Sequence, residues 1–292
     1  MTAVEIPAPD PDAAPEALKP LVEGVLGLDP AWFGTRRDPA GQERGVRRAA
    51  VLMLFGRHDD RRPGADGPDE GPGLDVLLTE RSSTLRSHAG QVAFPGGRVD
   101  PGDTGPVHAA LREAQEETGL DPAGVVPLAV LPELFIPPTG FLVTPVLAHW
   151  ADPVPVRAID PAEVARVVRV PVPVLTDPAN RFTVRGPRGH TGPAFRTSGL
   201  VIWGFTAGLL SALLQRSGWE RPWDGTQVEE LEDAWTVARR LHGSPGPAAP
   251  DDGDRHHADR NHADRNHGDQ YDAELRGERV TDPGGSSHEV GR

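Results

Sequence analysis

Residues 94–120, FPGGRVDPGDTGPVHAALREAQEETGL, are the stretch that decides how this chain is expected to fold. Pro106 to Thr118 has the composition of a helix, and Gly119 stands where helices commonly end in a left-handed residue. The small or apolar residues that would seat this helix on a sheet are Ala109, Ala110, Leu111 and Ala114. The stretch therefore predicts a helix packed against a β-sheet.

Three carboxylates stand near the end of this expected helix: Glu113, Glu116 and Glu117. Their spacing projects them from one side of the helix, where like charges repel by roughly a few tenths of a kcal/mol per pair. A hard cation such as Mg²⁺ or Mn²⁺ would relieve that repulsion, because it prefers carboxylate oxygens. The pattern alone leaves two interpretations open, a solvated acidic face, which is the commoner case, and a divalent-metal site.

A glycine pair, Gly96-Gly97, precedes the helix. Glycine permits tight turns and a close approach of the backbone to whatever the carboxylates face. A glycine-rich loop, a helix and an acidic cluster in this order could hold a metal–diphosphate complex. Gly96 and Gly97 are therefore candidate substrate-binding positions.

The chain around this stretch is typical of a mixed α/β domain. Strands are expected at 49–55, 74–79, 125–131 and 142–149, with one or two more within 164–174, and further helices at 201–216 and 227–241. Strands outnumber helices, so we expect a mixed sheet covered by helices. Residues 56–73 separate two apolar runs and are predicted to form a long hairpin loop.

The two ends of the chain are expected to lie outside the folded part. Residues 1–16 are acidic and Pro-rich, and 243–292 form a His/Asp-rich tract that contains ADRNH twice, with too few apolar residues to bury a core. The tail's His and Asp side chains could bind a divalent metal weakly, although repeat slippage in a solvated tail is the simpler interpretation. The folded domain is predicted to span 17–242, with its core at about 45–215 and an extra C-terminal helix at 227–241.

Composition excludes several classes of protein. Cys is absent, which excludes disulfides, thiolate zinc sites and a cysteine nucleophile. The net charge of -13 argues against a broad nucleic-acid-binding face, and no apolar run is long enough to cross a membrane. The N-terminus lacks the basic start and apolar core of a secretion signal, so a cytoplasmic location is expected.

Residues 112–120, REAQEETGL, resemble the second half of the Nudix hydrolase box, G-x5-E-x7-R-E-U-x-E-E-x-G-U, in which U is aliphatic. The first half departs from the box, because Asp103 stands where its first Glu is expected and one extra residue separates this position from Arg112. In this altered first half of the box the chain resembles the coenzyme A pyrophosphatase branch of the superfamily. The branch also carries the upstream pattern LLTxRS, which is matched by residues 77–82 and continues through Arg86 and Gly90 to Phe94-Pro95-Gly96-Gly97.

The resemblance implies a Nudix-type α/β/α sandwich with a mixed sheet and a role for each box residue. Glu113 and Glu117 would be direct ligands of Mg²⁺ or Mn²⁺, and Glu116 a third ligand or a contact through water. Arg112 would pair with Asp103 or Glu116 and fix the helix against the loop. The general base stays open between Glu116 and a carboxylate of a later loop, such as Glu133.

Two arginines upstream of the box, Arg81 and Arg86, are candidate substrate-binding residues. They could contact the 3′-phosphate or the diphosphate of the substrate, because Arg forms bidentate pairs with phosphate. They could equally form internal salt bridges with the box carboxylates. An adenine could stack on Phe135, Phe141 or Trp203, but core packing is the more economical interpretation of each.

Three functions compete at this point. The resemblance implies hydrolysis of coenzyme A or its acyl derivatives to 4′-phosphopantetheine and adenosine 3′,5′-bisphosphate. The alternatives are a Nudix hydrolase of another nucleoside diphosphate derivative, such as NADH, a nucleotide sugar or a deoxynucleoside triphosphate, and a non-catalytic Nudix-fold sensor. The expected partner is a small-molecule substrate, with no nucleic acid and no membrane, and a homodimer is left open.

Overall fold

The computed structural model describes residues 8–26, 47–57, 73–85, 88–136, 139–197 and 199–242. These residues belong to one compact unit, Met1–Pro247. The predicted loop at 56–73 falls largely outside them, as do Arg86, residues 1–7 and the tail at 243–292. No helix in the described part of the chain is long and apolar enough to cross a membrane.

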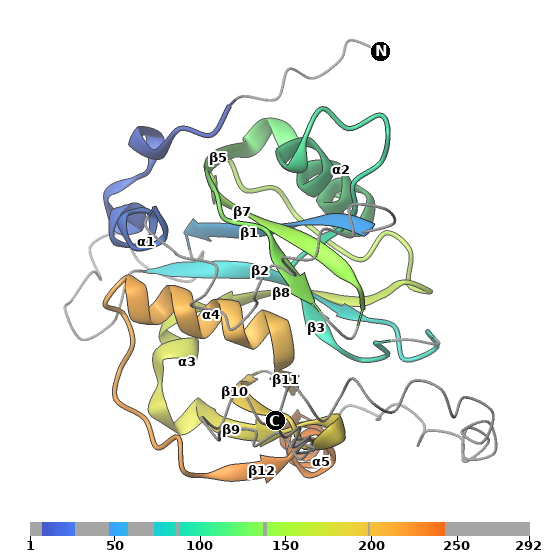
Figure 1. Ribbon diagram of the computed structural model, residues 1–292, viewed down its shortest axis with the longest axis vertical. Coiled ribbons are helices and arrows are strands. Elements are labelled where there is room, and N and C mark those ends of the chain that lie inside the picture. The colour runs from blue at the N-terminus through green and yellow to red at the C-terminus, as the bar shows by residue number, and fades with distance from the viewer. Residues whose placement is uncertain are drawn as a thin grey trace, which may run out of the picture. The chain divides into compact units, whose positions relative to one another are not determined.

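A mixed sheet forms the centre of the fold (Figure 1). Its strands within the described ranges are β1 (Arg47–Arg57), β2 (Leu74–Arg81), β3 (Val92–Ala93), β4 (Gly96–Arg98), β5 (Val125–Val130), β6 (Leu134–Ile136), β7 (Phe141–Trp150) and β8 (Val164–Pro171). The main order is β3-β2-β1-β7-β5, while β4 pairs with β1, β6 with β7 and β8 with β2. The long central pair, β1 and β7, is parallel, and the other pairs of this sheet are antiparallel.

Helices cover both faces of this sheet because β1 is apolar on both sides. The even-numbered residues Ala50, Leu52 and Leu54 pack with α2 (Pro106–Thr118). Met53 and Phe55 point the other way and share a core with α1 (Lys19–Val25) and α4 (Gly204–Arg216). The sheet with helices on its two faces agrees with the predicted α/β/α sandwich.

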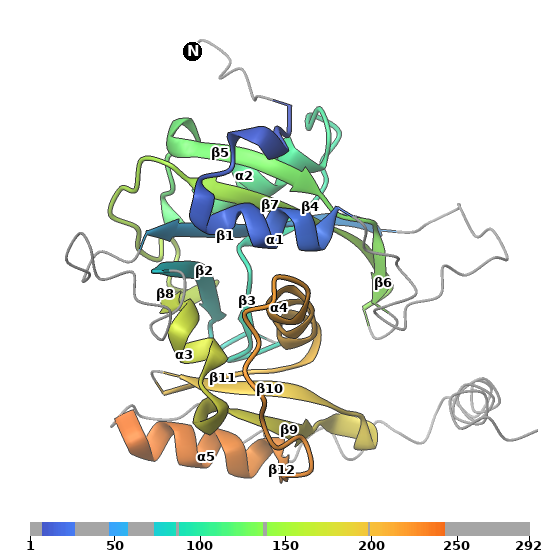
Figure 2. The same cartoon turned by 90° about the vertical axis from the view of Figure 1, so that its left-hand side faces the viewer.

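A second, smaller sheet follows in the chain (Figure 2). Its strands are β9 (Arg181–Arg185), β10 (Thr191–Thr197), β11 (Leu200–Ile202) and β12 (Val228–Glu230), in the order β11-β10-β9-β12. One face packs on α4 through Phe195 and Ile202, and the other packs on α5 (Leu231–His242) through Val184 and Ala194. A short helix, α3 (Val172–Thr176), connects β8 to this layer.

The structure corrects the start of two predicted helices. The apolar run at 201–216 is a strand, β11, followed by α4, and Gly204 separates them with a φ of 64°. The segment at 227–241 likewise begins as strand β12 before α5. The segment at 164–174 holds one strand, in agreement with the one or two expected there, and it ends at Pro171 because prolines 171 and 173 favour the start of a helical turn. For β11 and β12, pairing with a distant strand decided the local conformation.

The hairpin predicted between the first two strands is confirmed by their register, in which Arg57 lies opposite Leu74. Residues 8–16 belong to the stretch expected to be flexible. There the backbone N–H of Asp10 donates to the carbonyl of Pro127 on β5 at 3.0 Å, and Ala14 is buried. This stretch therefore packs on the sheet.

Candidate active site

The site is built on α2, whose ends are fixed by backbone chemistry. Pro106 occupies the first helical turn. Backbone N–H groups have no intrahelical acceptor there, so proline, which lacks an N–H, loses no hydrogen bond. Gly119 adopts a left-handed φ of 71° and donates its N–H to the carbonyl of Gln115 at 2.9 Å. The alanine face of the helix is buried against β1, so the opposite face presents the charged residues of the box.

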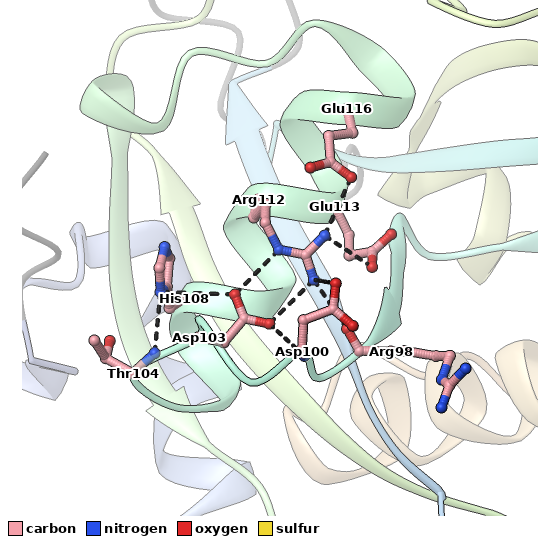
Figure 3. Close-up of polar contacts among 8 residues, drawn as sticks. All are labelled: Arg98, Asp100, Asp103, Thr104, His108, Arg112, Glu113 and Glu116. Carbon is pink, nitrogen blue, oxygen red and sulfur yellow. Dashed lines mark hydrogen bonds and ion pairs between the residues drawn. The ribbon is translucent and has the colours of Figure 1, made fainter. Parts of the chain in front are cut away.

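Arg112 is the centre of a network that joins the helix to the preceding loop (Figure 3). Its guanidinium donates to both carboxylate oxygens of Asp103 at 3.0 Å and to the carbonyl of Arg98 at 2.9 Å. It also lies 3.1 Å from the carboxylates of Glu113 and Glu116. Arg112 therefore pairs with both Asp103 and Glu116, which the sequence offered as alternative partners.

Asp103 fits the Arg112 guanidinium despite being shorter than the glutamate expected at this position. Its side chain is only 1% exposed, and it also accepts the backbone N–H of Asp100 at 2.7 Å. The side-chain hydrogen bond from Arg112 is the main cause that holds the pKa of Asp103 below its ordinary value, against the opposing effect of burial.

Replacing Asp103 by Asn is expected to lower the free energy of unfolding at pH 7 by about 2 kcal/mol, because a charge-assisted pair becomes a neutral contact. The lowered pKa means that the stabilisation is present above pH 3.8 and is lost as the pH falls through the folded-state pKa. Urea unfolding at pH 7, 5 and 3 should therefore show the two proteins converging in acid. Asp121→Asn, an exposed turn cap in which Asn keeps the acceptor, is the control, and a constant difference across this range would contradict the account.

Two of the three box carboxylates lie against the glycine pair. Gly96 donates its N–H to Glu117 at 3.2 Å. A Cβ built on Gly97 would lie 2.4 Å from the Glu113 carboxylate, and one on Gly96 would lie 2.3 Å from the carbonyl oxygen of Ala50. Only glycine therefore lets strand β4 pair with β1 while leaving room for both carboxylates.

Burial distinguishes these two carboxylates from ordinary surface glutamates. Glu117 is 7% exposed, and desolvation is the main cause that raises its pKa to about 8. Desolvation also raises the pKa of Glu113, although the Arg112 charge opposes it. In both groups burial disfavours the charged form, and a bound cation would offset that effect.

Glu116 points elsewhere. Its side chain is 60% exposed and its carboxylate lies on Arg112 (Figure 3). Among the described residues no three Asp, Glu or His side chains are close enough together to hold a metal ion by themselves. The structure therefore brings Glu113 and Glu117 together and leaves Glu116 on the solvent side.

Arg81, at the end of β2, carries a charge that lowers the pKa of Glu117, against the raising effects of burial and of the Glu163 charge. Its Nε atom is buried and has no hydrogen-bond partner, and its guanidinium forms no ion pair within the described residues. The internal salt bridge considered for Arg81 is therefore not observed there. Arg86, its companion in the sequence pattern, lies outside the described residues.

The remaining candidates are engaged in other contacts. Glu133 pairs with Arg48 at 3.1 Å. Trp203 packs edge-to-face on Trp235 with ring centroids 6.2 Å apart, as core packing predicts. Phe141 is half-buried beneath the guanidinium of Arg47, at 4.3 Å from its ring centroid.

One charged neighbour of the site carried no sequence signal. Glu163 precedes β8 and raises the pKa of Glu117, an effect that ranks behind burial but ahead of the contribution from Glu113. It lies far from the box in sequence, and no motif surrounds it. Only the folded chain brings it near Glu117.

Comparison with known proteins places similar sequences in one family. The model of the NUDIX domain matches residues 60–183. "Uncharacterized Nudix hydrolase NudL" of Cronobacter sakazakii is 40% identical over 187 residues, which cover 60% of this chain and 85% of that protein. The protein of the same name from Escherichia coli K12 is 39% identical over 176 residues, covering 59% and 83%.

Solved structures of Nudix proteins are also similar. RenU, a Nudix hydrolase from M. smegmatis, shares 25% identity over 43% of this chain and 70% of that one, with a TM-score of 0.33. A NUDIX hydrolase from Nitrosomonas europaea shares 13% identity over 63% and 79%, with a TM-score of 0.36. The identity and coverage of the NudL relatives, together with the box residues on α2, show that this chain belongs to the Nudix hydrolase family.

Proposed function

We propose that this Nudix hydrolase cleaves the diphosphate bond of coenzyme A or its acyl derivatives, with Mg²⁺ or Mn²⁺ as cofactor. The observation that carries the proposal is the pair of carboxylates of Glu117, which is buried, and Glu113, which is partly buried, together with the charge of Arg81 that acts on Glu117. Acidic groups for a cation and an arginine for an anion, side by side, suit a metal–diphosphate complex. The upstream pattern from Leu77 to Gly97 favours coenzyme A among the diphosphates that Nudix enzymes hydrolyse.

Glu113 and Glu117 are the residues that would hold the cation. Carboxylate oxygens suit a hard divalent ion, and Mg²⁺ commonly takes only one or two carboxylates, with waters and substrate phosphates completing its coordination. Two protein carboxylates are therefore sufficient, and Glu116 would contribute at most through water. When bound, the cation would neutralise charge on the diphosphate and polarise the attacked phosphorus.

The other residues position these groups. Arg112 would act as a positioning residue, because it ties α2 to Asp103 and to the strand that carries the glycine pair. Gly96 and Gly97 keep the backbone close enough for the carboxylates to sit beside it. The buried, unpartnered Nε of Arg81 would donate to a phosphate oxygen of the diphosphate, since an unpaired buried donor is costly.

The reaction is an in-line displacement by water. A water oxygen forms a bond to one phosphorus while the bridging P–O bond breaks, and the other phosphate leaves. The attacking water loses a proton in the same process. For coenzyme A the products are 4′-phosphopantetheine and adenosine 3′,5′-bisphosphate.

Removing divalent metal is expected to abolish hydrolysis, because the Glu113 and Glu117 carboxylates would then face the substrate diphosphate without a counter-ion. Treatment with EDTA should reduce the rate to background, and added Mg²⁺ or Mn²⁺ should restore it. Manganese binding measured by electron paramagnetic resonance gives a second readout that does not depend on turnover. Full activity after exhaustive chelation would refute the metal-dependent reaction.

A substrate panel tests the choice of coenzyme A. It would contain CoA, an acyl-CoA, dephospho-CoA, NADH, ADP-ribose and a nucleoside triphosphate, with products identified by mass. We expect release of 4′-phosphopantetheine from CoA or the acyl-CoA at the highest kcat/KM. A preference for NADH or ADP-ribose would keep the metal site and overturn the CoA assignment, while no turnover of any compound would favour a sensor.

A further inference from the structure

The loop before β8, residues 151–163, is hydrogen-bonded both to α2 and to the residue that follows β2. Near its middle, the backbone N–H of Arg157 donates to the carbonyl of Thr118 at 2.9 Å, and that of Ile159 donates to the carbonyl of Glu117 at 3.2 Å. The loop is therefore attached directly to the last turn of the helix that carries the site.

The end of the same loop is attached beside Arg81. Ser82 donates its N–H to the carbonyl of Glu163 at 2.8 Å, and the next residue, Val164, lies opposite Arg81 in the β2–β8 register. Residue 163 is thus anchored on both sides, by α2 through Ile159 and by β2 through Ser82. These anchors hold it next to the two elements that carry Glu117 and Arg81.

Electrostatics agree with this placement. Burial contributes most to the raised pKa of Glu117, and the Gly96 hydrogen bond opposes it. The next contribution is the charge of Glu163, which exceeds that of Glu113 one helical turn away. The Glu163 carboxylate is therefore close enough for its charge to act on the proposed metal ligand.

The other carboxylates near the site are already paired. Glu116 lies on Arg112, Glu113 touches the same guanidinium, and Glu133 pairs with Arg48. Glu163 is exposed and makes no side-chain hydrogen bond or ion pair with any other described residue. Among the described carboxylates whose charge acts on Glu117, it is the one without such a partner.

We propose that Glu163 is the general base of the reaction and takes the proton of the attacking water. This inference rests on the proposed hydrolysis of a diphosphate. As the water oxygen forms its bond to phosphorus, the O–H bond breaks and the proton passes to the Glu163 carboxylate. The bridging oxygen leaves with the other phosphate, and Glu163 returns its proton to solvent after product release.

The test compares Glu163→Gln with Glu232→Gln, a matched change on the exposed surface of α5. A general base contributes roughly 10²–10⁴-fold, so kcat of Glu163→Gln should fall about 100-fold or more. KM and manganese affinity should stay within about threefold of wild type. The thermal midpoint should stay within a few degrees of it. Formate should partly restore the rate of Glu163→Ala, because it can occupy the vacated space as a small base.

Each other outcome overturns the assignment. A kcat within about threefold of wild type would show that Glu163 takes no proton in the rate-limiting step. A tenfold loss of manganese affinity in Glu163→Gln would make it a metal ligand instead, and a large loss of thermal stability would make it structural. If the proposed function is wrong, the wild-type protein itself will fail to hydrolyse coenzyme A, whereas a wrong assignment of Glu163 shows only in the variants. The general base can then be tested on whichever diphosphate the wild type hydrolyses.

Discussion

Replacing Glu117 by Gln is expected to lower kcat about 10³-fold, because the proposed metal ion would supply several kcal/mol of charge stabilisation and the neutral Gln would bind it much more weakly. Gln keeps the size of the side chain and can still accept the Gly96 N–H through its amide oxygen. The loss should therefore come with a large drop in manganese affinity and without unfolding. Steady-state kinetics and manganese titration check the two effects together.

The same variant has a stability signature in EDTA. The pKa of Glu117 is raised to about 8 in the folded protein, so the stability linked to its proton is complete below pH 4.5 and is lost as the pH rises through 8. Glu117→Gln removes that loss, and the variant should be the more stable protein at pH 9 without metal. The control is Glu232→Gln, which should behave as wild type. Unchanged turnover in Glu117→Gln would remove this residue from the site, and intact substrate affinity without wild-type turnover would indicate a sensor.

Replacing Arg181 by Ala is expected to lower the free energy of unfolding by about 3–5 kcal/mol, the usual cost of removing one member of a buried ion pair. Its side chain is 0% exposed and lies 2.7 Å from Glu220 and 2.8 Å from Ser211. Its guanidinium also stacks between two rings, at 5.0 Å from the centroid of Phe195 and 4.6 Å from that of Trp223. The substitution would leave Glu220 without its partner and open a cavity between the rings.

Arg185→Ala is the matched control for this experiment. Arg185 is on the same strand and pairs with Glu230 at 2.6 Å, but both side chains are about half-exposed. Solvent-exposed pairs contribute about 0–1 kcal/mol, so the control should change stability little. Urea unfolding measures both variants, and equal losses would show that burial does not set the contribution of Arg181.

The second, smaller sheet is the part of the fold that could not be predicted from the sequence. Val201 and its neighbours are as apolar as the helix that follows them, so the run at 201–216 has no internal sign of a strand. Pairing of Leu200–Ile202 with β10 supplies the hydrogen bonds that decide the strand. Such pairing depends on residues that are distant until the chain folds, which is why local periodicity extended the helix too far.

The sequence by itself determined the central architecture and the chemistry of the box. The apolar strands around 49–55 and 142–149, the helix at 106–118 and the glycine that ends it could all be predicted, because each depends on local periodicity or backbone conformation. The pairing of Arg112 with an acidic side chain followed from the resemblance to the Nudix box. Each of these features depends on residues at fixed spacing along the chain and can therefore be predicted from the sequence alone.

Only the tertiary structure decided which carboxylates share a site. The three box glutamates look equivalent in sequence, but β4 packs on Glu113 and Glu117, while Glu116 turns to Arg112 and solvent. Glu163 reaches the same place only because its loop is bonded to α2 and β2 at once. The charge and burial of a side chain depend on neighbours from distant segments, and the raised pKa of Glu117 therefore exists only in the folded chain.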